Sequence, residues 1–202
     1  PFTSMVCVTE LHERHPVAVD VNREYRKKVR LASRQLLDIL NNVLEMARIE
    51  SKQIIIEEEL NNTREFFDAW TSVFEGEMKK KNLTFETSYE IEHQYLYFDR
   101  THVMELLMNI LSNSVKYTAN NGKIFAGVRD LPGGKEGECI VETTVRDNGI
   151  GMSKAFQAQI FEQFSRERNS SQSGIQGTGL GMAIVKRIVE MMNGTITIKS
   201  KL

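Results

Sequence analysis

The first fifty residues carry hydrophobic side chains at helical spacing and contain no glycine. A short helix is predicted up to Pro16, where the proline ends it, and a second helix is predicted over residues 22–50. Apolar side chains along the second helix recur in alternating steps of four and three, as in a heptad seam: Tyr25, Val29, Ala32, Leu36, Ile39, Val43 and Met46. The pattern predicts an antiparallel helical hairpin over residues 1–52.

Further apolar residues widen this stripe: Leu37, Leu40, Leu44 and Ala47. A hairpin with so broad an apolar face cannot bury it alone, whereas two hairpins paired as a four-helix bundle bury it. We therefore expect a homodimer formed through the N-terminal helices. The alternative is that the hairpin packs against the rest of its own chain.

From residue 53 onward, short apolar runs alternate with amphipathic segments. The predicted strands are residues 54–56, 83–85, 95–98, 123–128, 139–145 and 195–199. The predicted helices are residues 66–78, 103–117, 155–164 and 181–192. Because these elements do not form a regular strand–helix–strand succession, we expect an α+β fold, an α/β two-layer sandwich over residues 53–202. The stretch 51–53 would join it to the hairpin, and the serine-rich residues 166–176 are expected to form a mobile loop.

The composition is that of an ordinary globular protein, with 41% hydrophobic and 26% charged residues in a chain of 202. The 26 basic and 27 acidic side chains leave a net charge of −1, so no basic excess indicates binding to nucleic acid. The chain holds no run of about eighteen apolar residues, so we expect no membrane contact from it. Cys7 and Cys139 lie far apart in no metal-ligand spacing, which predicts reduced thiols in a cytosolic setting.

Two glycine-rich segments, residues 147–152 and 177–181, each surround a single polar side chain. The second leads directly into the helix predicted over residues 181–192. Glycine lets a main chain approach a ligand without a Cβ in the way, and a helix start offers unpaired N–H groups and the positive end of the helix dipole. This combination is typical of a phosphate site, so the chain is predicted to bind a nucleotide.

The helix predicted over residues 103–117 carries three polar side chains on one face. Asn109 and Asn113 lie four residues apart, and Lys116 follows three residues later. Oxygen ligation by Asn113 suits a Mg²⁺ ion held mostly by a nucleotide, and Lys116 is placed to meet phosphate oxygens. The alternative is a solvated helix face with asparagines that have no function.

Four segments resemble, in their order and spacing, the nucleotide-binding boxes of sensor histidine kinases. Residues 109–118 (NILSNSVKYT) resemble the N-box, 147–152 (DNGIGM) the G1 box, 160–164 (IFEQF) the F-box and 177–181 (GTGLG) the G2 box. Residues 45–50 (EMARIE) resemble the end of the dimerisation and phosphotransfer hairpin of that family. The resemblance covers essentially the whole chain, and it implies a GHKL-type ATP-binding domain with ATP and Mg²⁺ as ligands.

The resemblance implies roles for residues around the base and sugar. Asp147 is expected to be a buried carboxylate that accepts a hydrogen bond from the adenine amino group; an unmatched buried polar group costs about 1–3 kcal/mol, which discriminates against other bases. Gly149 and Gly151 are expected to let the chain pass close to the base and sugar. Lys116 and Tyr117 are expected to line the phosphate and ribose side.

On the phosphate side, the resemblance implies that Asn113 holds Mg²⁺ with Asn109 in support. A cradle for phosphate at the helix start is expected from five consecutive residues: Gly177, Thr178, Gly179, Leu180 and Gly181.

The residues before this cradle resemble the lid of the family. Phe161 and Phe164 are expected to anchor the lid over the site, and the alternative is that both are ordinary core aromatics. Arg166 is expected to neutralise the γ-phosphate, and the alternative is a solvated charge on the lid. The chain departs from the common family pattern at Gln163 and Ser165, so the lid chemistry is the part least supported by the resemblance.

Catalysis in this family needs a phosphoacceptor histidine in a segment like H-E-x-x-T-P on the first helix. Pro1 resembles the last residue of that segment, so the acceptor is expected upstream of the sequence given, and this fragment is not expected to phosphorylate itself. His12 superficially echoes the motif, but Pro16 and a turn follow it, whereas the acceptor belongs in mid-helix. Surface or capping roles are expected for the remaining histidines: His15, His93 and His102.

The resemblance implies a protein-histidine kinase that moves a phosphoryl group from Mg·ATP to a histidine and then to an aspartate in the receiver domain of a response regulator. The fragment is expected in the cytoplasm, with a membrane-anchored sensor as its parent and one further strand after residues 195–199. One alternative is another ATPase of the same superfamily, of gyrase, chaperone or mitochondrial protein-kinase type. A second is a non-catalytic ATP-binding module that regulates another kinase.

Overall fold

The computed structural model describes residues 25–33, 36–37, 40–41, 44, 55–133, 135–166 and 178–202. The chain divides into two compact units, Pro1–Ile54 and Ile55–Leu202. In the first unit every described residue is helical, as the heptad pattern predicts for that stretch. The first helix of the predicted hairpin and its turn lie outside the described residues. None of the described helices combines the length and the hydropathy needed to cross a membrane.

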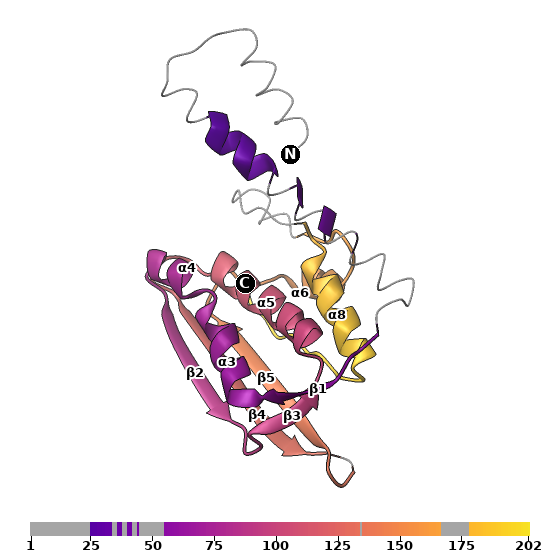
Figure 1. Ribbon diagram of the computed structural model, residues 1–202. Helices are drawn as coiled ribbons and strands as arrows, with labels where there is room; N and C mark the ends of the chain where they lie inside the picture. Colours follow the sequence, from indigo (N-terminus) through magenta and orange to yellow (C-terminus); the bar gives the residue numbers. More distant parts are fainter. Residues whose placement is uncertain are drawn as a thin grey trace. The chain divides into compact units, whose positions relative to one another are not determined.

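The second unit is built from five strands and five helices among the described residues (Figure 1). The strands are β1 (Glu59–Asn62), β2 (Thr84–Glu90), β3 (Tyr95–Phe98), β4 (Lys123–Pro132) and β5 (Cys139–Asp147). The helices are α3 (Thr63–Ser72), α4 (Glu75–Lys80), α5 (Arg100–Tyr117), α6 (Lys154–Gln159) and α8 (Gly181–Met191). This mixture of helices and strands confirms the predicted α+β class.

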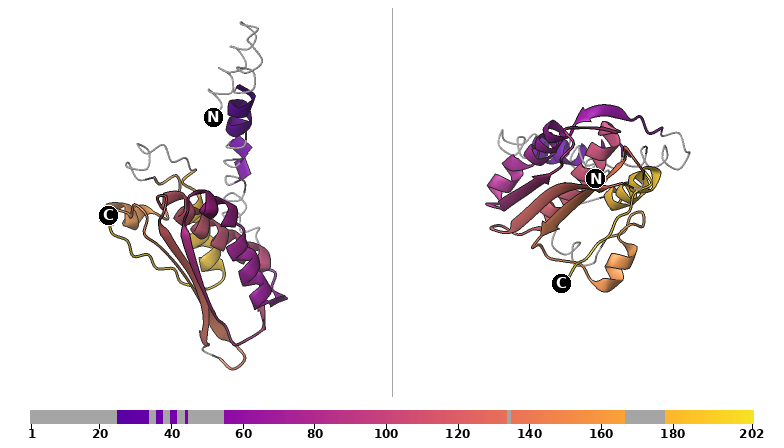
Figure 2. Two further views of the ribbon diagram at one scale, coloured as in Figure 1. Left: turned by 90° about the vertical axis from the view of Figure 1, so that its left-hand side faces the viewer. Right: turned by 90° about the horizontal axis from the view of Figure 1, so that it is seen from below.

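The main sheet has the order β2-β4-β5, with β2 parallel and β5 antiparallel to the central strand β4. Helices α3, α5 and α8 lie on one face of this sheet, which gives two layers (Figure 2). Alternate β4 residues face the helices, as the period of two in a strand requires: Ile124, Ala126 and Val128. They form one core with buried side chains of the helices: Phe66, Phe67, Trp70, Met78, Leu107, Leu111 and Val115.

The strand predicted at residues 54–56 is wrong. Ile55 and Ile56 have no regular structure, and Ile55 is 74% exposed. The strand forms instead at β1, which pairs antiparallel with β3, and the Asn61 side chain donates to the main-chain oxygen of Phe98 (3.0 Å). The strand therefore begins where its main chain can form hydrogen bonds with β3, and not at the run of isoleucines.

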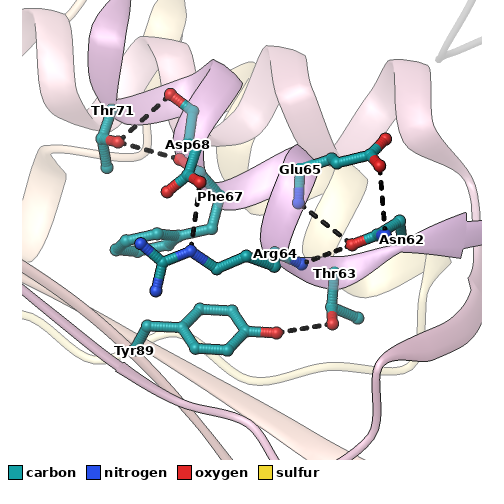
Figure 3. A network of polar contacts seen from close by, with 8 residues as sticks. All are labelled: Asn62, Thr63, Arg64, Glu65, Phe67, Asp68, Thr71 and Tyr89. Atoms are coloured by element: carbon teal, nitrogen blue, oxygen red, sulfur yellow. Dashed lines mark hydrogen bonds and ion pairs between the residues drawn. The ribbon is translucent and has the colours of Figure 1, made fainter.

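The single helix predicted at residues 66–78 is two helices. Asn62 caps the first, because its side-chain oxygen accepts hydrogen bonds from the main-chain nitrogens of Arg64 and Glu65, both at 3.1 Å (Figure 3). The helix breaks before Phe74, whose φ of −98° and ψ of 5° lie outside helical geometry. The break lets Met78 on α4 enter the same core as the aromatic residues of α3.

Two predicted elements near the C-terminus also differ. The helix predicted at residues 155–164 ends at Gln159, and Phe164 has a φ of +61° that no right-handed helix allows. Residues 195–199 keep an alternation of exposed and half-buried positions, but this described segment is not a β-strand. Farther along, the main-chain oxygen of Ser200 accepts a hydrogen bond from the Gln157 side chain (3.2 Å), so the segment returns to α6.

Cys139, at the start of β5, is a free thiol, as its spacing predicts. Burial raises the pKa of this thiol, and the neighbouring Asp130 carboxylate raises it further. Cys7 lies outside the described residues.

Candidate nucleotide-binding site

Asp147 ends strand β5 and is held by two donors. The Ser114 hydroxyl on α5 donates to Oδ2 at 2.9 Å, and the main-chain nitrogen of Gly149 donates to Oδ1 at 3.0 Å. Asp147 is exposed rather than buried as expected, at the end of the strand. Its orientation is nevertheless determined by the protein, with lone pairs left on both oxygens.

The turn that follows Asp147 is attached to the end of α5. The main-chain nitrogen of Ile150 donates to the main-chain oxygen of Tyr117 at 3.2 Å. A Cβ on Gly149 would lie 2.7 Å from that same oxygen, so only glycine allows this approach. At Gly151 a side chain would overlap the main chain of Lys201, so this glycine also serves the packing of the protein itself.

Asn109 and Asn113 lie one turn apart on α5, as predicted, and both are half-buried. The Asn109 side-chain nitrogen donates to the main-chain oxygen of Glu105 at 3.0 Å. Its oxygen would lie 2.7 Å from a Cβ on Gly181, the first residue of α8, so a side chain at residue 181 would displace it. The Asn109 side chain on α5 therefore packs closely against Gly181 at the start of α8.

Lys116 and Arg166 place two positive charges near the end of α5. Lys116 is half-buried, and its Nζ lies 5.0 Å from the centre of the Tyr117 ring. Burial lowers the pKa of Lys116, and the positive charge of Arg166 lowers it further. Two cations that disfavour each other in the free protein make a site that an anion stabilises.

The segment after α6 reaches both α8 and the second glycine-rich segment. Lys186 of α8 lies with its Nζ 5.7 Å from the centre of the half-buried Phe161 ring. Phe164 is 62% exposed, so its interpretation as a core aromatic is wrong. A Cβ on Gly179, which has a φ of +75°, would lie 2.7 Å from the carbonyl carbon of Phe164.

The described part of the second glycine-rich segment forms a tight turn into α8. The main-chain nitrogen of Leu180 donates to the Thr178 hydroxyl oxygen at 3.2 Å, and the Leu180 side chain is 1% exposed. The helix that follows the turn is held in the protein by its buried residues: Ala183, Ile184, Val185 and Ile188. Gly177 lies outside the described residues.

The structure thus brings the predicted segments together around the C-terminal half of α5. The turn after β5 touches Tyr117, the start of α8 touches Asn109, and the charge of Arg166 acts on Lys116. The arrangement offers an oriented carboxylate at one place and paired cations at another along the same helix. Such a site suits a ligand with a hydrogen-bonding base and an anionic group. The half-buried Asn113 on the same helix is a suitable oxygen ligand for Mg²⁺.

Sequence reasoning missed two residues that support this site. Ser114 lies in the segment that resembles the N-box, but the resemblance implies no role for it. Lys81, directly after α4, lies in no recognised motif. The Lys81 ammonium donates to the main-chain oxygens of Val115 and Thr118 at 2.7 Å and 2.6 Å. Both contacts join residues more than thirty positions apart, and no local pattern signals them.

Both described histidines contact carboxylates, in keeping with the surface or capping roles expected of them. The His93 ring lies 2.6 Å from Asp130 and is mostly exposed. The His102 ring lies 2.7 Å from Asp99, whose other oxygen accepts the His102 main-chain N–H at the start of α5. His12 and His15 lie outside the described residues.

Comparison with known proteins places this part of the chain in a family. The model of the histidine kinase-, DNA gyrase B- and HSP90-like ATPase family matches residues 98–202, just over half of the chain. The virulence sensor protein BvgS of Bordetella bronchiseptica is 27% identical over 99% of this chain. The chain covers only 16% of BvgS, so it spans about a sixth of that relative.

Two solved structures share the fold. Full-length ShkA in complex with AMPPNP has a TM-score of 0.72 and 22% identity, over 90% of this chain and 36% of its own. The histidine kinase ThkA in complex with the response regulator protein TrrA has a TM-score of 0.70 and 22% identity, over 95% of this chain and 52% of its own. The chain therefore belongs to the histidine kinase-, DNA gyrase B- and HSP90-like ATPase family, and its relatives support an ATP-binding domain of a two-component sensor kinase.

Proposed function

We propose that this chain is the ATP-binding part of a sensor histidine kinase, which binds Mg·ATP and supplies the γ-phosphoryl group to a histidine. One observation carries the proposal: near the end of α5, Ser114 orients the carboxylate of Asp147 from β5, and Lys116 lies close enough to Arg166, which follows α6, for their positive charges to interact. These are the groups that a purine base and a triphosphate require.

At the base end, Asp147 accepts a hydrogen bond from the adenine amino group. Ser114 and the Gly149 main-chain nitrogen hold the carboxylate before the nucleotide arrives, so little of the binding free energy is spent on ordering it. Guanine presents a carbonyl oxygen at that position, which a carboxylate repels. The exposure of Asp147 in the free protein leaves it accessible to the base.

At the phosphate end, Lys116 and Arg166 stabilise the charge of the triphosphate, and the repulsion between them is relieved when the anion binds. Asn113 would be an oxygen ligand of Mg²⁺, and the ion, when bound, would supply charge neutralisation for the phosphoryl group. The turn from Thr178 to Leu180 provides main-chain groups for the phosphates. The protein thus contributes position and charge, and the nucleophile is an imidazole outside this chain.

Dimerisation and phosphotransfer are the finer parts of the proposal. In the first unit, Leu37, Leu40 and Leu44 are each about half exposed, which supports burial against a second copy in a four-helix bundle. The complex between ThkA and TrrA supports a response regulator as the partner that receives the phosphoryl group on an aspartate. The name of BvgS supports a sensor as the whole protein.

Titration of the 202-residue chain with a fluorescent ATP analogue and Mg²⁺ tests the proposal. We expect saturable binding that unlabelled ATP displaces and GTP does not. Replacing Asp147 with asparagine is expected to weaken binding about tenfold, which corresponds to about 1.4 kcal/mol. Asp68→Asn on the exposed face of α3 is the matched control and keeps wild-type affinity. Equal affinity of the Asp147 and Asp68 variants would contradict the assigned adenine contact.

A further inference from the structure

Lys81 follows helix α4 and is half-buried beneath the end of α5. Its ammonium donates to three main-chain oxygens, those of Val115 (2.7 Å), Lys116 (3.3 Å) and Thr118 (2.6 Å). A lysine ammonium has three hydrogens, so these contacts use its full donor capacity. A cation at this place also complements the negative end of the helix dipole.

The remaining oxygens at the end of α5 have other partners. The Ser114 oxygen accepts from the Thr118 main-chain nitrogen at 3.0 Å, and the Tyr117 oxygen accepts from the Ile150 nitrogen at 3.2 Å. Helix ends leave their last carbonyl groups without partners inside the helix, and these must be satisfied elsewhere. Here the Lys81 ammonium and the turn after Asp147 together provide donors for these carbonyl oxygens. Both therefore stabilise the same C-terminal end of α5.

Lys81 is itself held at its main chain. Its oxygen accepts a hydrogen bond from the Asn121 nitrogen at 2.9 Å, and its N–H donates to the Glu77 oxygen at 3.2 Å. The loop after α4 is thus connected to the loop after α5. Because the main chain of Lys81 is fixed in this way, its side chain can hold the end of α5 in place. A mobile lysine on the surface could not.

We propose that Lys81 is a positioning residue of the nucleotide site, which holds the last turn of α5 so that Ser114, Lys116 and the turn after Asp147 keep their places. This inference rests on the proposed ATP-binding function. Lys81 touches no nucleotide and acts only through the three oxygens that it binds. Removing the ammonium leaves those oxygens without their donor, and the end of α5 and the attached Ile150 turn loosen together.

The test compares Lys81→Met, which keeps the unbranched side chain except for its terminal ammonium, with Lys80→Met at the exposed neighbouring lysine. Both variants are studied in the 202-residue chain at a temperature where circular dichroism shows them fully folded. We expect Lys81→Met to bind the fluorescent ATP analogue about tenfold more weakly than Lys80→Met, a difference of about 1.4 kcal/mol. Equal affinity of the two folded variants would overturn the proposal.

Amide hydrogen exchange without nucleotide separates this inference from the proposed function. In Lys81→Met, the amides of Thr118 and Ile150 are expected to exchange about tenfold faster, by local opening, while the amides of β3 exchange at the rate seen in Lys80→Met. Uniformly faster exchange, or no change, would mean that Lys81 does not position this turn. If the wild-type chain binds no ATP, the proposed function fails, and the exchange pattern still decides the role of Lys81.

Discussion

The Ser114 hydroxyl donates a hydrogen bond of 2.9 Å to the carboxylate of Asp147, and so connects helix α5 with the end of strand β5. The two residues are separated by 33 positions in the chain. The bond determines how the carboxylate is turned before any ligand arrives, because Gly149 holds the other oxygen. The orientation of the group proposed to recognise adenine therefore depends on a serine of the neighbouring helix.

Replacing Ser114 with alanine is expected to weaken ATP binding about fivefold, since the carboxylate loses one of two fixed donors and a net hydrogen bond contributes about 1 kcal/mol. Titration with a fluorescent ATP analogue measures the change. Ser112→Ala is the control, because a residue two positions earlier lies on a different side of the helix. An unchanged affinity in Ser114→Ala would show that water orients Asp147 as well as the serine does.

Replacing Lys116 with methionine is expected to affect stability and binding in opposite directions. Burial and Arg166 lower the pKa of Lys116, so the charged lysine destabilises the free protein at neutral pH. Lys116→Met should therefore raise the urea midpoint of the nucleotide-free chain and weaken ATP binding more than adenosine binding.

The pH dependence of that stability difference checks its electrostatic cause. A lysine with a lowered pKa binds fewer protons in the folded than in the unfolded state between its folded value and 10.5, so wild-type stability rises with pH through this window. The advantage of Lys116→Met should shrink correspondingly as the pH approaches 10.5. An advantage that does not change over this window would point to packing instead of charge.

Gly179 and Gly76 are expected to respond oppositely to alanine. At Gly179 a left-handed backbone costs alanine about 1–2 kcal/mol, and the added Cβ would lie 2.7 Å from the carbonyl carbon of Phe164. Gly76 lies in α4 with no atom within 4 Å of an added Cβ, so alanine there should stabilise by about 0.5–1 kcal/mol. Urea unfolding measures both, and a Gly179→Ala variant as stable as the wild type would refute the contact with Phe164.

Asp99 caps α5 and receives three hydrogen bonds, from the main-chain nitrogens of His102 (2.9 Å) and Glu57 (3.0 Å) and from the His102 ring (2.7 Å). Asp99→Ala is expected to lose about 1–2 kcal/mol of unfolding free energy. Asp99→Asn keeps a capping oxygen and should lose less. Chemical denaturation of the three proteins gives the comparison, and equal stability of the alanine variant would show that the cap contributes nothing.

The charge on Asp99 also predicts a pH dependence. Burial raises the pKa of this carboxyl, but the hydrogen bonds outweigh burial and the net pKa is lowered. A lowered carboxyl pKa gives stability that is present above the ordinary value of 3.8 and is lost as the pH falls through the folded value. Wild-type stability should therefore fall more steeply than that of Asp99→Ala under acid conditions, and parallel curves would contradict this.

The local sequence pattern predicts an element correctly where its hydrophobic period and the residues at its two ends indicate the same bounds. The strand at Tyr95–Phe98 and the helix from Gly181 are predicted almost to the residue, because the first is a short aromatic and apolar run between polar residues and the second is a helical stripe between glycines. Helix α5 was predicted from residue 103 and begins at Arg100, because the Asp99 cap extends it. The helix predicted over 66–78 was wrong in its middle, where continuous apolar spacing hid the break at Phe74.

The amino-acid sequence by itself determined the α+β class, the amphipathic faces, and the order and spacing of the four segments that identify the family, since these depend on neighbours a few residues apart. Only the tertiary structure decided that Asp147 is exposed and turned by Ser114, that Asn109 seats α8, and that Lys81 closes the end of α5. These contacts join side chains and main-chain groups far apart in the chain. They come together only when burial of the core packs α5 against the sheet.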